Sequence, residues 1–162
     1  MKKILIISTG GTFNKIYDPL KGEFIIDKSS HALQEIASKW LCEFEILNII
    51  GKDSLEITNH DRLELLATIS QSDYHHILIV HGTDTVDITA EYLADADLEK
   101  CIVLTGTMVP FSIDPVEATA NLASAYGYMN ALEKEGIFIV MNGVMGAYDK
   151  VKKDRSKGRF SL

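Results

Sequence analysis

Short apolar runs alternate with longer amphipathic segments along this chain of 162 residues, and this alternation constrains the fold more than any other feature. The runs are rich in Ile, Val and Leu and too short for helices, as expected of strands that are covered on both faces. They span Lys3–Ser8, Phe44–Ile49, His76–Val80, Cys101–Leu104 and Ile137–Met141. Strands that alternate with helices form a parallel sheet. We therefore expect one α/β domain over residues 1–162, a three-layer sandwich around a mainly parallel five-stranded sheet.

Helices are expected between these strands, because the intervening segments carry helix-start signals. Ser29 or Ser30 can cap the first helix, and Thr58 followed three residues later by Asp61 is typical of a capped N-terminus. Pro115 opens a long segment, in the first turn, where its missing N–H costs nothing. Ligands of such sheets bind beyond the carboxyl ends of the strands, so the residues that follow each strand decide the function.

Composition and charge exclude several classes of protein. The formal net charge is −7, although residues 150–159 hold six basic residues and one acid. An acidic body argues against nucleic acid as the main partner, and the apolar runs are too short to span a membrane. Cys42 and Cys101 lie in apolar segments without metal-ligand spacing. We therefore expect buried thiols, no metal site and a cytoplasmic location.

Three of the expected strands end in glycine beside hydroxyl residues. The three segments are Thr9–Thr12, His81–Thr85 and Thr105–Thr107. Glycine lets the backbone turn tightly and approach a ligand, and threonine supplies a donor, acceptors and a candidate nucleophile. In a parallel sheet these exits are expected to converge on one crevice.

Nucleotide binding and serine-hydrolase chemistry are the alternatives for such strand exits. The chain contains neither a Gly-x-Gly-x-x-Gly pattern nor a Gly-Lys-Ser/Thr loop, so a nucleotide-binding domain is the less favoured interpretation. A Gly-x-Ser-x-Gly elbow is absent as well. His81 follows a strand, but we expect it to hold its loop by hydrogen bonding rather than to act as a base.

The same segments resemble a known family. Thr9–Thr12 resembles the first signature of the asparaginase/glutaminase family, and His81–Thr85 resembles the second, more distinctive one. Asp53–Thr58, Leu104–Pro110 and Met141–Asn142 resemble later loops of the family in the same order. The resemblance is to the N-terminal domain of bacterial-type L-asparaginases, without their C-terminal domain. The sheet is accordingly expected to be flavodoxin-like.

The resemblance implies roles for particular residues. Thr12 would be the nucleophile, and Thr83, Asp84 and Lys153 would form a companion hydroxyl–carboxylate–amine group. Asp84 would also hold the α-ammonium of the substrate. Lys153 matches the family lysine better than Lys150 or Lys152, because its distance from Met141–Asn142 agrees best with the family. The expected substrate-binding residues are Gly11, Asp53, Ser54, Gly82 and Thr107. The chemistry would require no metal or cofactor.

Departures from the family pattern favour weak or altered activity. Leu55 follows Ser54 where the family has a polar residue, and Phe24 stands where it has a tyrosine, with Tyr17 as the nearest phenol. We expect the second domain of the family, which completes the pocket, to be absent. The chain is therefore expected to be either an L-asparaginase-like amidohydrolase or a non-catalytic module that binds an amino acid or belongs to a larger complex.

The resemblance further implies asparagine or aspartate as the small-molecule partner and a homo-oligomer, either dimer or tetramer. Tyr126, Tyr128 and Met129 are expected either to extend an apolar helix face for that assembly or to belong to the core of the domain.

Overall fold

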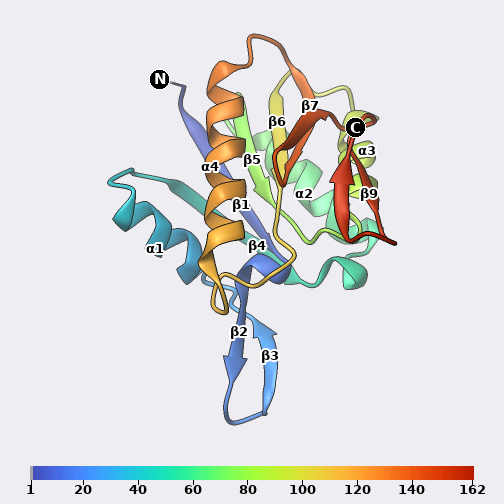
Figure 1. Cartoon of the computed structure of the whole chain (residues 1–162). Coiled ribbons are helices and arrows are strands. Elements are labelled where there is room, and N and C mark those ends of the chain that lie inside the picture. The colour runs from blue at the N-terminus through green and yellow to red at the C-terminus, as the bar shows by residue number, and fades with distance from the viewer. Residues whose placement is uncertain (1) are drawn as a thin grey trace.

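A computed structural model describes residues 2–162, and its centre is a six-stranded sheet (Figure 1). The strands are β1 (Ile4–Gly10), β4 (Glu45–Lys52), β5 (His76–Val80), β6 (Cys101–Thr105), β7 (Gly136–Met141) and β8 (Val144–Ala147). Their order in the sheet is β4-β1-β5-β6-β7-β8; the first five are parallel and β8 is antiparallel to β7. Counted along the chain, the parallel strands follow the flavodoxin-like order 2-1-3-4-5.

The five predicted runs are the five parallel strands, so the mainly parallel sheet is confirmed. The prediction of five strands is one short, because the antiparallel edge strand β8 is only four residues long and contains Gly146. A two-residue turn, Asn142 and Gly143, joins it to β7. Both turn residues have positive φ (51° and 80°), as tight hairpin turns require.

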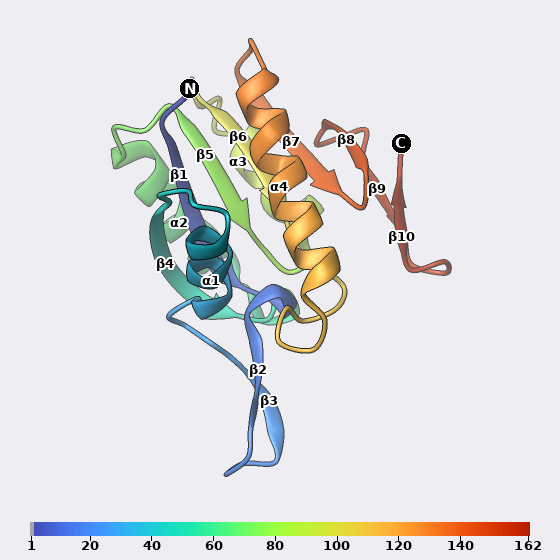
Figure 2. The same cartoon turned by 60° about the vertical axis from the view of Figure 1, so that its left-hand side comes forward.

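Helices cover both faces of the sheet, which confirms the predicted three layers. On one face lie α1 (His31–Lys39) and α4 (Pro115–Ala131), which Figure 2 shows in front of the strands. On the other face lie α2 (Asn59–Gln71) and α3 (Val86–Ala94). No helix of residues 2–162 combines the length and apolar character that crossing a membrane requires.

The buried strands supply side chains to two separate cores. In β1, Leu5 and Ile7 pack with α2 and α3, whereas Ile4 and Ile6 pack with α1 and α4. Successive residues of a strand point to opposite faces, so a strand covered on both faces must be apolar throughout. This is why the parallel strands are readable as continuous apolar runs.

The predicted caps are correct for α2 and wrong for α1. Thr58 Oγ1 accepts from the Asp61 N–H at 3.1 Å and the Asp61 carboxylate accepts from the Thr58 N–H at 2.9 Å, a complete capping box. Ser30 precedes α1 with a left-handed backbone and makes no side-chain cap. Asp27 caps that helix instead, because its Oδ2 accepts from the His31 N–H at 3.0 Å.

Two small hairpins flank the sheet. The first, β2 (Lys15–Asp18) with β3 (Glu23–Ile26), projects away from the body near the end of β1 (Figures 1 and 2). The second, β9 (Lys152–Asp154) with β10 (Arg159–Ser161), carries the basic residues of the tail. Phe160 is buried against one of the two cores, so the basic segment is anchored to the domain.

Of the two interpretations of the apolar residues on α4, packing within the domain is the one that the structure favours. Met129 is fully buried in a core. The Tyr126 ring lies 5.3 Å from the Trp40 ring, and the Tyr128 ring lies 5.9 Å from the Phe138 ring. These three residues stabilise the domain itself and give no support for an assembly.

Candidate functional site

The exits of β1 and β5 touch at the carboxyl edge of the sheet, where the sequence predicts a crevice. Gly11 has φ of 78°, and a Cβ there would lie 2.6 Å from the backbone nitrogen of Gly82. A Cβ on Gly82 would in turn lie 2.5 Å from the Ser54 Cβ. Only glycine permits such close approach. Thr12 and Thr83 directly follow these two glycines in the sequence.

Lys153 joins two residues that lie far from it in the sequence. Its Nζ donates to Thr83 Oγ1 and to Asp84 Oδ1, both at 2.9 Å. The Lys153 side chain is only 15% exposed, whereas neighbouring Lys152 is exposed. The hydrogen bond from Lys153 outweighs the effect of burial and holds the pKa of Asp84 below its ordinary value. The structure therefore brings together the hydroxyl, amine and carboxylate that the sequence pattern singled out.

Arg155 is a contact of Asp84 that sequence reasoning missed. Its Nη1 donates to Asp84 Oδ1 at 3.1 Å and its Nη2 donates to the Asp84 backbone carbonyl at 2.7 Å. Arg155 stands two residues after Lys153 and opens the turn that follows β9. That spacing is the sequence signal that was available.

Thr12 begins a short 3₁₀ turn, Thr12–Asn14, at the end of β1. Its side chain is half-buried, and the structure records no hydrogen bond to its hydroxyl within the described chain. The two aromatic residues of the following hairpin, Tyr17 and Phe24, contact each other across the strands with ring centres 5.6 Å apart. Neither aromatic ring has a recorded contact with Thr12 within residues 2–162.

Asp53 and Ser54 open a short turn that packs against the loop after β5. Ser54 is buried, and its carbonyl accepts from the Thr85 hydroxyl at 2.8 Å. Asp53 is engaged by protein donors, the Leu55 N–H at 3.1 Å and Lys15 Nζ at 3.0 Å. Burial alone would raise the pKa of Asp53, but these donors outweigh it and the pKa is lowered. The Leu55 side chain is 71% exposed.

Glu117 and Asn121 of α4 hold the loop after β6 in place. The Glu117 carboxylate accepts from the Thr107 hydroxyl, from the next two backbone N–H groups and from Asn142 Nδ2. Asn121 donates to the Gly106 carbonyl at 2.8 Å. Thr107 is buried, so its hydroxyl serves the loop rather than a ligand, and only its backbone stays available for the predicted contact. The one-turn spacing of Glu117 and Asn121 on a helix signals a shared face, but not what that face contacts.

His81 fixes the loop after β5 through a fully buried hydrogen-bond chain. Arg62 Nε donates to Thr89 Oγ1 at 2.9 Å, Thr89 Oγ1 lies 2.8 Å from His81 Nε2, and His81 Nδ1 lies 2.7 Å from the Gly82 carbonyl. This chain fits a neutral imidazole that donates from Nδ1 and accepts at Nε2. Burial lowers the pKa of His81 to about 4. As predicted, His81 holds the loop.

Comparison with known proteins shows the family to which the chain belongs. The family model described as asparaginase, N-terminal, matches residues 3–161. The chain belongs to the asparaginase family.

Asparaginases and a component of an amidotransferase are among the proteins that it resembles. A probable periplasmic L-asparaginase of Haemophilus influenzae is 30% identical over 94% of the chain and 46% of that protein. A glutamyl-tRNA(Gln) amidotransferase component from Methanococcus maripaludis is 29% identical over 90% of the chain and 36% of that protein. The thermostable L-asparaginase of Thermococcus kodakarensis aligns with a TM-score of 0.85 and 25% identity, covering 99% of this chain and 51% of that one. The chain thus spans about half the length, or less, of these relatives.

The charged groups around the asparaginase-type site are paired with one another. Within residues 2–162 no group of three or more His, Cys, Asp or Glu side chains has the arrangement of a metal site. The carboxylates near the strand exits accept instead from basic side chains, Asp53 from Lys15 and Asp84 from Lys153.

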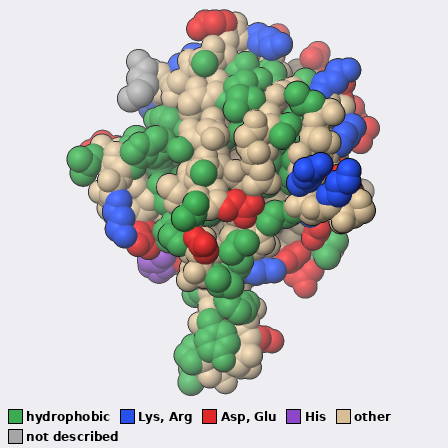
Figure 3. All heavy atoms as spheres, in the orientation of Figure 1, with side chains coloured by type: hydrophobic (Ala, Val, Ile, Leu, Met, Phe, Trp, Pro, Cys, Tyr) green, Lys and Arg blue, Asp and Glu red, His purple; other side chains and the backbone are tan. Residues whose placement is uncertain are grey.

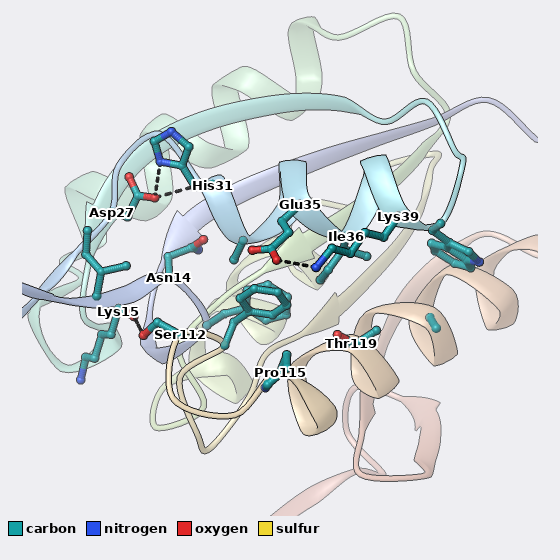
Figure 4. Close-up of a pocket in the computed structure, with 16 residues that line it drawn as sticks. Asn14, Lys15, Asp27, His31, Glu35, Ile36, Lys39, Ser112, Pro115 and Thr119 are labelled. Carbon is teal, nitrogen blue, oxygen red and sulfur yellow. Dashed lines mark hydrogen bonds and ion pairs between the residues drawn. The ribbon is translucent and has the colours of Figure 1, made fainter.

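The asparaginase domain also has a cavity of about 680 Å³ between α1 and α4. Figure 4 shows the Glu35–Lys39 ion pair, the Asp27–His31 pair and Asn14 around it. None of the nine candidate site residues lines this cavity. It is a groove beside the site and contributes nothing to the Thr83–Asp84–Lys153 group.

The β2–β3 hairpin of the asparaginase domain presents apolar side chains to solvent. Figure 3 shows them gathered on the projecting arm, and the exposed ones include Ile16, Tyr17, Leu20 and Phe24. An isolated two-stranded hairpin is at best marginally stable in water. A surface of this kind is typical of a segment that packs against something else.

The close packing of the strand exits makes a direct prediction for Gly106. An alanine Cβ there would collide with the His81 carbonyl oxygen, which belongs to backbone and cannot rotate away. We expect Gly106→Ala to lower the free energy of unfolding by about 2–3 kcal/mol. The control is Gly127→Ala in exposed helix, where nothing lies within 4 Å and where alanine should add about 0.5–1 kcal/mol. Urea unfolding of both variants checks this; a stable Gly106→Ala protein would contradict it.

Proposed function

We propose that this chain is an amidohydrolase of the L-asparaginase type, which releases ammonia from the side-chain amide of L-asparagine or a closely related short amide. The observation that carries the proposal is the contact of Lys153 Nζ with both Thr83 Oγ1 and Asp84 Oδ1. A lysine held between a hydroxyl and a carboxylate fits covalent catalysis by a hydroxyl nucleophile. The proposed reaction uses no metal or cofactor.

Thr12 is the proposed nucleophile. Its oxygen attacks the amide carbon, the C–N bond breaks, and ammonia leaves after the nitrogen takes up a proton. Thr83 is proposed to accept the Thr12 proton while it gives its own hydroxyl proton to the departing nitrogen, and Lys153 is proposed to hold the Thr83 oxygen in place for this relay. Water then attacks the acyl-threonine ester, which releases L-aspartate and restores the Thr12 hydroxyl.

The backbone beside the touching glycines is proposed to stabilise the tetrahedral intermediate. Gly11, Gly82 and Thr107 would supply backbone contacts, and losing one oxyanion donor typically slows a reaction by about 10²–10³-fold. Ser54 is proposed to bind the α-carboxylate, within a loop that Asp53 orders through the Leu55 N–H. Asp84 is proposed to face the α-ammonium.

Ammonia release from L-asparagine tests the proposal. We expect the purified chain to release ammonia, Thr12→Ser to retain activity because it keeps a hydroxyl, and Thr12→Ala to show none above background. The control is the thermal midpoint of each variant, which a half-buried threonine should leave nearly unchanged. Equal rates for the wild type and Thr12→Ala would overturn the role of Thr12.

A second candidate function is a non-catalytic module that binds an amino acid or forms part of a larger complex. The exposed Leu55 and the occupation of Asp84 by Arg155 favour it, as does the similarity to an amidotransferase component. Stabilisation of the chain by L-aspartate without ammonia release would support this alternative.

The proposed assembly and the proposed location each rest on one structural observation. A homo-oligomer, dimer or tetramer, is proposed because the apolar β2–β3 arm requires a covering surface. A cytoplasmic location is proposed because Cys42 and Cys101 are free thiols, although the H. influenzae relative is described as periplasmic.

A further inference from the structure

Arg155 changes the charge that a ligand meets at Asp84. The Asp84 carboxylate faces two basic side chains, because Oδ1 accepts from Lys153 at 2.9 Å and from Arg155 at 3.1 Å. The second guanidinium nitrogen of Arg155 donates to the Asp84 backbone carbonyl, which holds the guanidinium against this residue. One negative and two positive charges leave this corner of the site with a net positive charge.

The other carboxylates near the strand exits, those of Asp53 and Glu117, already have partners within the protein. Asp53 is paired with Lys15 at 3.0 Å, and the Glu117 carboxylate accepts four hydrogen bonds from the loops that it holds. Asp84 Oδ2 has no hydrogen bond within residues 2–162, so an ammonium can still reach it. However, an ammonium placed there would be repelled by the two cations that share Oδ1.

We propose that Arg155 sets the substrate class of this site: short amides that carry a carboxylate and need no α-ammonium. Succinamate, which is asparagine without its α-amino group, is the simplest member. The part of this inference that concerns hydrolysis rests on the proposed amidohydrolase function. The part that concerns ligand binding does not require the chain to be an enzyme. The net positive charge around Asp84 attracts the carboxylate of such a ligand. The absence of an α-ammonium costs little binding energy, because Lys153 and Arg155 already neutralise Asp84, the carboxylate that the ammonium would face.

Calorimetric binding of succinate and L-aspartate, the corresponding acids, tests the inference without any reaction. We expect the wild type to bind the two acids with Kd values within about threefold of each other, because the ammonium adds little at a neutralised carboxylate. Arg155→Gln should shift the ratio of Kd values toward L-aspartate by about fivefold or more, because it removes one cation from Asp84. Arg155 is 61% exposed, so the substitution should leave the fold intact.

Lys157→Gln is the matched control. Lys157 lies in the same turn and also carries a positive charge, but it pairs with Asp154 at 3.8 Å rather than with Asp84. Its ratio of Kd values should equal that of the wild type. A shift as large as that of Arg155→Gln would show that overall charge decides, and would overturn the inference.

The turnover experiment separates this inference from the proposed function. Ammonia release from succinamate and L-asparagine at similar kcat/KM, with a change toward L-asparagine in Arg155→Gln, would support both. Absence of ammonia release from either amide, with the expected shift in binding, would sink the amidohydrolase proposal and leave the inference standing. An unchanged binding ratio in Arg155→Gln, or no binding of either acid, would overturn the inference.

Discussion

Replacing Lys153 by methionine is expected to lower kcat/KM for ammonia release by about a thousandfold, within the range that a positioned proton-transfer group contributes. Methionine has nearly the length of lysine but no amine, so Thr83 Oγ1 and Asp84 Oδ1 lose the group that bridges them at 2.9 Å. Asp84 keeps Arg155 as a partner, so its charge does not become unpaired. The loss should therefore appear in activity more than in stability.

Lys152→Met is the matched control for this prediction. Lys152 is the adjacent residue in β9, but it is exposed where Lys153 is mostly covered. Successive residues of a strand point to opposite sides, so Lys152→Met should stay within about twofold of the wild-type rate. Both variants should unfold at similar temperatures. Equal activity of the two variants would exclude Lys153 from the reaction.

How much of the fold was predictable depends on how each strand is buried. The parallel strands are covered on both faces, which forces continuous apolar runs such as Ile77–Val80. The hairpin strands β2 and β3 are exposed and mix charged with apolar residues, so they carry no clear period. The edge strand β8 was signalled only by Asn142–Gly143, a two-residue turn sequence that predicts a hairpin when strands flank it.

The site was predictable as a set of residue types and not as a set of contacts. Glycine and hydroxyl residues at strand exits, with the resemblance to the family, were enough to single out Thr83, Asp84 and Lys153. Arg155 binds Asp84 across 71 positions, and Glu117 binds Asn142 across 25. Such contacts depend on which strands are neighbours and on how loops cross the sheet edge, and local sequence patterns specify neither.

Acid is expected to destabilise this domain through His81, by about 3 kcal/mol between pH 7 and pH 4. Burial lowers the pKa of His81 from 6.5 to about 4 in the folded state. Below pH 6.5 the unfolded chain therefore takes up a proton that the folded protein does not accept. The contribution to stability is complete above pH 6.5 and is lost as the pH falls toward about 4.

His81→Gln isolates this contribution. Glutamine does not titrate, so the variant should be less stable at pH 7, where it loses the bonds to Thr89 and the Gly82 carbonyl, yet should lose less stability on acidification. Other groups act alike in both proteins: burial also lowers the pKa of His76, and Asp61 has a lowered pKa that matters only in stronger acid. Urea unfolding at steps of half a pH unit gives the free energy of unfolding of each protein from pH 7 to pH 4. The difference between the two proteins should change by about 3 kcal/mol over this range, in favour of the variant at low pH. Parallel curves would mean that the buried imidazole becomes protonated in the folded protein, and that the chain from Arg62 to Gly82 does not hold it neutral.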